Sequence, residues 1–240
     1  MNTKYYIGCS GFYYSAWRGH FYPSDVKPKD WLHYYNSILN TVELNGTFYR
    51  QPKLADLKKY YAATDSSFRF SVKMSKYVSH IKRLKDCAQQ IRDFHALIEE
   101  GLHDKLACIL YQMPPSFHYN DDNIERVMNI PSSPNNVIEF RHASWWNEEV
   151  YALLRKHNIT MCNVDLPDMP VPIADTSINF YMRMHGNPIL FKSEYDMNDL
   201  IALAKAIPAH TSNNYIYFNN TYFDAGYTNA AQLKQLLGID

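Results

Sequence analysis

Short apolar runs alternate along the chain with longer segments in which apolar residues recur at helical spacing. Alternation with a period of two predicts strands, and recurrence at three and four residues predicts amphipathic helices. We predict strands at 4–10, 41–48, 68–74, 106–113, 136–142, 160–165, 178–185 and 214–220. We predict helices near 28–39, 53–63, 86–100, 121–129, 144–157 (with Ser144 as its N-cap), 198–207 and 229–237. The Pro-rich link 166–175 is too broken for a full helix.

Strands that alternate with helices or long crossovers predict a parallel sheet. In a chain of 240 residues, eight such units match a single closed (β/α)8 barrel, the TIM-barrel fold, and we expect one domain over residues 1–240. The alternative is an open, doubly wound sheet, but its usual Gly-rich phosphate turn is absent after the first strand. The α/β barrel is therefore the preferred prediction.

The strand at 136–142 has an unusual polar face. Its alternation places Glu139 and Arg141 on one face, and Ile138 and Phe140 on the other. Burying unpaired charges costs several kcal/mol, so charged groups on a central strand must be paired or must face a wet cavity. Either this strand is a solvated edge, or its charged face lines a site.

When every predicted strand is anchored by its apolar, helix-facing residues, a set of polar side chains faces inward. Most lie at the carboxyl end of their strand, where TIM-barrel active sites are built. The inward set is Ser10, Glu43, Asn45, Arg69, Lys73, Gln112, Glu139, Arg141, Asn163, Asp165, Arg183, His185 and Asn219. A functional site would explain this convergence. The alternative is a structural ion-pair network, for example with Glu139 paired to Arg141 and Asp165 paired to Arg183.

Three histidines, His80, His142 and His185, follow strand ends and are candidate site residues. With the carboxylates, they supply enough donors for a divalent ion. However, no HExxH or other close ligand spacing is present, and the interleaved cations would oppose a metal cluster. Cations around a mouth suit a phosphate or carboxylate better. We therefore predict no metal site and no cofactor, with a divalent metal as the alternative.

The loop 11–23 is rich in aromatic residues. It can form a stacking platform over the mouth or a lid that packs on the barrel. We expect Trp17 and Phe21 to pack on the barrel, and we leave the role of Phe12, Tyr13 and Tyr14 open.

Composition narrows the class of protein. A formal net charge of zero gives no bulk attraction for nucleic acid or an anionic membrane, so we expect neither as a partner. No apolar run is long enough to span a membrane, and the chain opens directly on a strand-like run rather than a signal peptide. The four cysteines are scattered without CxxC spacing. We expect free buried thiols and a cytoplasmic location.

Several segments together resemble the domain-of-unknown-function 72 family, also called YecE-like. They are Ile7-Gly-Cys-Ser-Gly11, Trp17-Arg-Gly19, Phe21-Tyr-Pro23, Thr41-Val-Glu-Leu-Asn45, Thr47-Phe-Tyr-Arg50, Gln112-Met-Pro-Pro115, Ile138-Glu-Phe-Arg-His142, Tyr181-Met-Arg-Met-His-Gly186 and Tyr217-Phe-Asn-Asn220. The resemblance implies a TIM barrel. It implies no reaction, because the activity of the family is not established.

The positions that match the motifs of the family are Glu43, Asn45, Lys73, His80, Gln112, Glu139, Arg141, His142, Asp165, Arg183, His185, Gly186, Asn219 and Asn220. The chain departs from the pattern at Phe12, at Gly46 and in Val78-Ser-His80, where the family often has Trp, Ser and Ile-Thr-His. These departures affect the expected lid contacts and leave every charged position of the mouth in place.

The leading hypothesis is a cytoplasmic enzyme, a hydrolase or isomerase, that acts on a small polar, anionic metabolite. Its expected catalytic residues are Glu43, Glu139, Asp165 and His185, with the two glutamates as general acid and base. Its expected substrate-binding residues are Asn45, Lys73, His80, Gln112, Arg141, His142, Arg183 and Asn219. The alternatives are a non-catalytic ligand-binding protein and a metal-dependent barrel enzyme that acts on nucleic acid.

Overall fold

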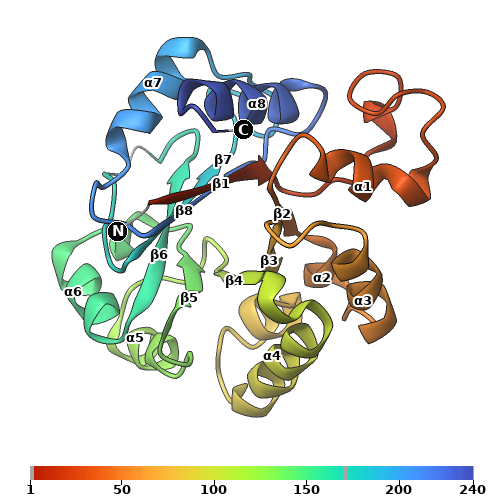
Figure 1. The fold of residues 1–240 in the computed structure, drawn as a ribbon. Helices are drawn as coiled ribbons and strands as arrows, with labels where there is room; N and C mark the ends of the chain where they lie inside the picture. Colours follow the sequence, from red (N-terminus) through yellow and green to blue (C-terminus); the bar gives the residue numbers. More distant parts are fainter. Residues whose placement is uncertain (1–2, 170–171, 240) are drawn as a thin grey trace.

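The computed structural model of the chain describes residues 3–169 and 172–239. Eight parallel strands form a closed barrel in chain order (Figure 1). They are β1 Lys4–Cys9, β2 Thr41–Leu44, β3 Arg69–Lys73, β4 Leu106–Gln112, β5 Ser133–Glu139, β6 Ile159–Asp165, β7 Asn179–Met184 and β8 Asn213–Phe218. The pairing of β1 with β8 closes the ring. The prediction of a single (β/α)8 TIM barrel is confirmed.

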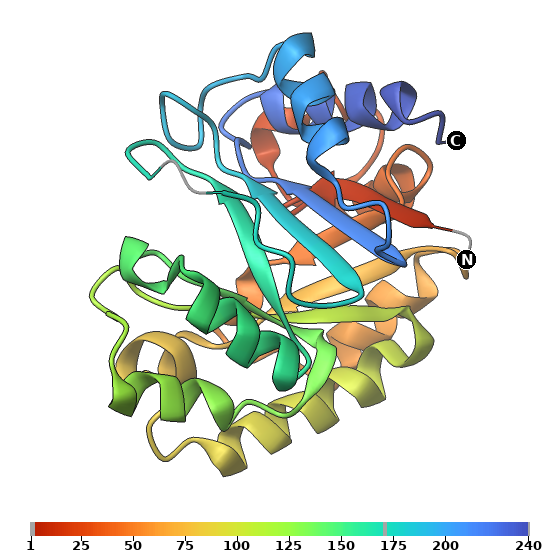
Figure 2. The same cartoon turned by 90° about the vertical axis from the view of Figure 1, so that its left-hand side faces the viewer.

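Helices cover the outside of the barrel (Figures 1 and 2). They are α1 Trp31–Asn36, α2 Gly46–Tyr49, α3 Leu54–Ala62, α4 Ala88–Leu102, α5 Asp121–Met128, α6 Glu148–Lys156, α7 Met197–Ala206 and α8 Ala225–Leu236. Shorter helical turns lie at Ser15–Trp17, Pro28–Asp30, Tyr77–Ile81, His103–Lys105 and Ala143–Trp145. Over the described ranges, none of the helices has the length and apolar character needed to cross a membrane.

Tyrosine side chains fill much of the barrel interior below the mouth. Tyr6 and Tyr215 stack with their ring centroids 5.0 Å apart. The hydroxyl of Tyr217 lies 2.7 Å from Thr41 Oγ1 and 2.8 Å from Ser71 Oγ. Buried tyrosines need partners for their hydroxyl groups, and these inward-facing hydroxyls supply them. The polar groups at the strand ends therefore lie above an interior filled by packed side chains rather than above an open pore.

Strand β6 faces the opposite way from the prediction. Its inward residues are Cys162 and Val164, which belong to the interior cluster, and the Cys162 thiol lies against Glu139. Asn163 instead points to the outer layer, where its amide accepts from Ala174 N (2.7 Å) and donates to Ala174 O (3.1 Å). The prediction that Asn163 and Asp165 face inward is therefore wrong, because the apolar residues of this strand line the barrel interior.

Two helix boundaries also differ from the predictions. Helix α6 is capped by Asn147, whose side chain accepts from Val150 N, whereas Ser144 lies in the preceding short turn. Helix α8 begins at Ala225, earlier than predicted. The described part of the link between β6 and β7 forms no helix, as the Pro-rich sequence indicated. Trp17 and Phe21 are buried as expected, and all four cysteines are buried free thiols.

Candidate functional site

A fully buried layer of charge lies at the carboxyl end of the barrel. Arg183 donates from Nη1 to Glu139 Oε2 (2.6 Å) and from Nη2 to Glu43 Oε2 (2.8 Å). The hydroxyl of Tyr181 donates to the other oxygen of Glu43 at 2.8 Å. The arginine side chain is 1% exposed and both carboxylates are 0% exposed. Each charge is therefore paired and hydrogen-bonded, as burial requires.

Glu139 also holds a second guanidinium. Arg141 donates from Nε to Glu139 Oε1, and its Nη2 lies 3.1 Å from His185 Nε2. Burial alone would raise the pKa of Glu139, but the guanidiniums of Arg141 and Arg183 hold this pKa well below its ordinary value. Glu139 is thus an ionised anchor that orients two arginines.

His185 is a neutral support for Arg141. Burial, assisted by the charge of Arg183, lowers the pKa of the ring to about 3. Because a guanidinium can only donate, Nε2 of the imidazole accepts from Arg141. The other ring nitrogen lies 2.8 Å from the side-chain amide of Asn219. His185 therefore fixes the arginine in place from below.

A cavity of about 530 Å³ opens above this layer. Its walls come from the ends of several strands and from the loops that follow them. The lining residues are Asn45, Phe48, Tyr49, Lys73, Lys76, His80, Gln112, Arg141, Arg183, Phe191, Asn219 and Thr221. Four of them are cations and none is a carboxylate, so the wall of this cavity is strongly positive. Seven of the eight predicted substrate-binding residues lie here.

Lys73, the last residue of β3, has a free amine in this wall. Its backbone is fixed because Thr47 Oγ1 donates to Lys73 O at 2.6 Å. No hydrogen bond or ion pair joins Nζ to another residue in the described ranges; the amine lies over the Phe48 ring, 4.3 Å from its centroid. Burial and the nearby Arg183 charge lower the pKa of Lys73 to about 8.

His80 lies beside Lys73 on the same aromatic ring. The ring centroids of His80 and Phe48 are 4.9 Å apart in an edge-to-face contact, and His80 Nδ1 lies 3.0 Å from Ser79 Oγ. Burial, followed by the charge of Lys73, lowers the pKa of His80 to about 4. At neutral pH the imidazole is uncharged and able to accept a proton.

Two polar atoms of cavity-lining residues are buried without a hydrogen-bond partner among the described residues. They are Asn45 Oδ1 and Arg183 Nε. An unpaired buried polar group costs about 1–3 kcal/mol, so such groups in a binding site are natural contacts for a ligand or water. One is an acceptor and the other a charged donor.

Asp165 and His142 do not line this cavity. Asp165 accepts from Asn187 Nδ2 at 3.1 Å and faces the loop after β7. It forms no pair with Arg183, whose carboxylate partners are Glu43 and Glu139. The predictions that Asp165 belongs to the cluster, or pairs with Arg183, are therefore wrong. His142 lies against His118, with ring centroids 3.9 Å apart.

Several cavity residues escaped prediction because of their local structure. Strand β2 ends at Leu44, and the residues that follow form the short helix α2. This turn carries Phe48 and Tyr49 to the cavity, although strand periodicity placed Phe48 in the barrel wall. Phe191 arrives on the loop after β7, where Gly186 adopts a left-handed φ of 87°. Lys76, close after the end of β3, was the residue that a search of strand-end loops could have found.

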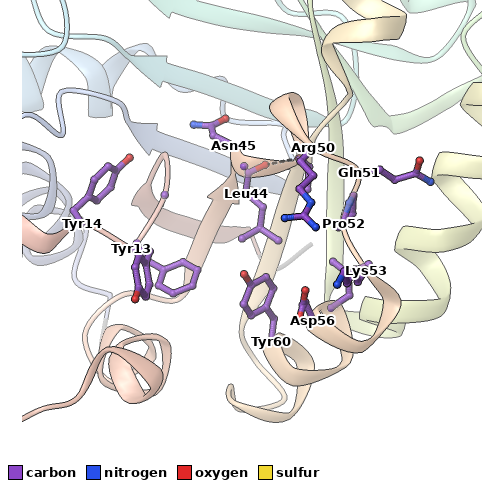
Figure 3. A pocket seen from close by; sticks show the side chains of 15 residues that line it. Tyr13, Tyr14, Leu44, Asn45, Arg50, Gln51, Pro52, Lys53, Asp56 and Tyr60 are labelled. Carbon is purple, nitrogen blue, oxygen red and sulfur yellow. Dashed lines mark hydrogen bonds between the residues drawn. The ribbon is translucent and has the colours of Figure 1, made fainter.

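A second cavity, of about 450 Å³, adjoins the first and shares Asn45 with it. Figure 3 shows Tyr13 and Tyr14 on one side of it, opposite Arg50 and Lys53. Phe12, Tyr13 and Tyr14 thus line this side cavity rather than the positive one. Its charged residues have mixed signs, and most of the predicted site residues lie elsewhere. The positive cavity is therefore the better candidate for the site.

No three His, Cys, Asp or Glu side chains in the described part of the chain come together in a way that could hold a metal ion. Glu43 and Glu139 each accept a hydrogen bond from Arg183 instead. The two glutamates therefore act as partners of a cation in this structure. The prediction that the protein needs no metal or cofactor stays a prediction.

Comparison with known proteins gives a consistent result. The family model described as "Protein of unknown function DUF72" matches residues 6–240. The UPF0759 protein YunF of Bacillus subtilis is 28% identical over 160 residues, which are 61% of this chain and 54% of that protein. The chain thus spans about half the length of this curated relative.

Solved structures agree over the whole barrel. A DUF72 family protein from Thermotoga maritima is 31% identical, with a TM-score of 0.87 over 98% of this chain and 99% of the other. Another from Enterococcus faecalis has a TM-score of 0.82 at 18% identity, over 98% of this chain and 96% of the other, which supports the fold alone. The resemblance found in the sequence motifs is confirmed, and the chain belongs to the DUF72 family.

Proposed function

We propose that the positive cavity binds a small anionic metabolite and that the protein acts on it as an enzyme, of hydrolase or isomerase type. The observation that carries this proposal is the charge of the cavity wall, which has four cations and no carboxylate. A cavity of about 530 Å³ has the size of a site for a small molecule. Its place at the carboxyl ends of the strands is where TIM-barrel enzymes bind their substrates.

The two arginines are suited to hold the anion. Glu139 and His185 occupy Nε and Nη2 of Arg141, and no described residue bonds to its Nη1. Arg183 keeps its Nε free in the same way. Guanidinium groups that are already fixed by other contacts lose little entropy when they bind a carboxylate or phosphate. Both side chains are therefore preorganised anion donors.

We assign proton transfer to His80 rather than to the two glutamates. Glu43 and Glu139 lie below the cavity wall, each bonded to Arg183, so they act on a ligand through the arginines. His80 lines the cavity and is uncharged at neutral pH. A neutral imidazole beside an amine of lowered pKa favours catalysis over ligand storage, because perturbed groups of this kind cluster at active sites.

Titration calorimetry with phosphate, sulfate and small carboxylates tests the binding step. We expect Arg141→Met to weaken the best anion by at least about 10-fold, the effect of one charged hydrogen bond. The matched control is Arg92→Met, which removes the same charge from the exposed face of α4, where Arg92 bonds to Gln89. Equal affinity in the wild type and the Arg141→Met variant would show that the anion binds elsewhere.

Turnover separates an enzyme from a binding protein. Each compound that binds would be incubated with the protein and followed by proton NMR. An enzyme converts at least one of these compounds or its close analogues, and His80→Ala slows the conversion while leaving anion affinity within a few-fold. We also propose the cytoplasm as the location, which the four free thiols support.

A further inference from the structure

Lys73 is half-buried, and its surroundings differ from those of Lys105, the buried lysine of the described residues. Lys105 is 4% exposed, and its Nζ donates to Tyr61 O (2.7 Å) and Thr64 O (2.6 Å). Those acceptors explain why Lys105 can be buried, and its role is structural. Lys73 has no such acceptor within the described residues, and its amine lies in the wall of a cavity. Packing does not explain why a lysine, rather than an apolar residue, stands at this position.

The surroundings of Lys73 favour the neutral amine. The side chain is partly withdrawn from water, and the guanidinium of Arg183 opposes its charge more strongly than either Glu139 or Glu43 supports it. A desolvated lysine next to another cation is a recognised form of activated amine nucleophile. A useful fraction of such an amine is unprotonated near neutral pH, whereas ordinary surface lysines are almost fully charged.

We propose that Lys73 is a nucleophile that forms an imine with the carbonyl carbon of a substrate that also carries an anionic group. This inference rests on the proposed function, because Arg141 and Arg183 would hold the anionic group while Lys73 meets the carbonyl. It deepens that function by naming the substrate class, a small aldehyde or ketone that bears a phosphate or carboxylate.

The chemistry balances without an oxidant or reductant. The lone pair of the Lys73 nitrogen forms a bond to the carbonyl carbon, and the π electron pair of C=O moves to oxygen. His80 carries one proton from the nitrogen to this oxygen, which gives a carbinolamine with one N–H and one hydroxyl group. The nitrogen lone pair then expels the hydroxyl group, which takes up a second proton from solvent through His80 and leaves as water. Amine, carbonyl and one proton thus give a protonated imine and water. The protonated imine then withdraws electrons from the neighbouring carbon, which suits proton transfer there and therefore an isomerase.

Reductive trapping tests this proposal. Pyridoxal 5′-phosphate, a probe that joins an aldehyde to a phosphate, would be added at one equivalent, followed by sodium borohydride, and the adduct would be located by peptide mass spectrometry. We expect Lys73 to carry most of the label, with labelling reduced at least 10-fold in Lys73→Arg. Lys58→Arg is the matched control, since Lys58 is an exposed lysine of α3 that lines neither cavity, and this variant should label at Lys73 like the wild type.

A second measurement separates this inference from the proposed function. Pyridoxine 5′-phosphate keeps the phosphate but has no aldehyde, and its binding would be measured by titration calorimetry. If it binds in an Arg141-dependent manner while labelling is spread over surface lysines and unchanged in Lys73→Arg, the imine proposal is overturned and anion binding stands. If neither pyridoxine 5′-phosphate nor simple anions bind, the proposed function itself fails. Lys73→Met, melted beside the wild type, shows that loss of label is not loss of fold.

Discussion

Arg183 belongs both to the buried ion-pair network and to the wall of the positive cavity. It is buried between two carboxylates, and Glu139 and Glu43 raise its pKa despite the opposing effect of burial. Its Nη atoms stabilise the layer below the cavity, while its buried Nε has no hydrogen-bond partner among the described residues. One side chain therefore serves both the ion-pair network and the candidate site, two interpretations that the sequence left as alternatives.

We expect Arg183→Met to destabilise the protein by about 3–5 kcal/mol, because it leaves Glu43 buried without its cation and Glu139 paired with Arg141 alone. The unfolding free energy would be measured by urea titration. Arg141→Met is the control: its side chain is 14% exposed and it leaves Glu139 paired with Arg183, so the loss should be smaller. Equal losses of unfolding free energy in the two variants would contradict the prediction that Arg183 stabilises the buried carboxylates more than Arg141 does.

The pH dependence of this loss follows from the carboxylates. In the wild type, the depressed pKa of Glu139 stabilises the fold above the ordinary value of 4.5, and this contribution is lost as pH falls through the folded-state pKa. In Arg183→Met, burial acts on Glu139 with one cation fewer to oppose it, so the carboxylate of Glu139 binds a proton more readily and acid destabilises the variant less than the wild type. The difference in stability should therefore be smaller at about pH 5 than at about pH 7.

The charge of Lys73, unlike that of Glu139, should lower the stability of the fold. Its folded-state pKa of about 8 lies below the ordinary 10.5, so the unfolded chain holds the proton more tightly and the wild type gains stability as pH rises between these values. We expect Lys73→Met to melt about 2–4 °C higher than the wild type at pH 7, a gain on the order of 1 kcal/mol. This gap should narrow toward about pH 10. A lower melting temperature at pH 7 would indicate that the lysine is structural.

At the scale of elements, strand β6 and the link that follows it show where sequence patterns mislead. Alternation indicates which residues share a face, but not which face is inside. On the other strands the polar residues near the carboxyl end lie inside, as with Glu43 and Glu139. On β6, Cys162 and Val164 fill the interior, and Asn163 bonds to Ala174 in the link that follows the strand.

The hydrogen bonds from the Asn163 side chain to Ala174 in the link should stabilise the fold. We expect Asn163→Ala to cost about 1–3 kcal/mol, because it leaves the backbone N–H and C=O of Ala174 without their partner in a buried place. Urea unfolding would measure the change. Asn129→Ala, on an exposed residue after α5, is the control and should stay within about 0.5 kcal/mol. A similar small effect at Asn163 would mean that water replaces the amide.

Across the whole molecule, topology explains why so much of the site was predictable. Parallel strands that close into a barrel bring all their carboxyl ends to one mouth, so Lys73, Arg141 and Arg183 meet although they are far apart in the chain. The residues that were missed, such as Phe48 and Phe191, reach the cavity on turns whose paths depend on local backbone geometry and not on periodicity. That residues 1–240 form one domain stays a prediction.

The central claim is that a small anion binds between the arginines and Lys73. Diffraction from crystals soaked in sodium tungstate, an electron-dense analogue of sulfate and phosphate, measures this directly through anomalous scattering. The account predicts a tungstate peak inside the cavity, within hydrogen-bonding distance of Arg141 Nη1 and Arg183 Nε. Added phosphate should weaken this peak, because the two anions compete for the same site. Tungstate peaks only at other positions, with the cavity lacking one, would contradict it.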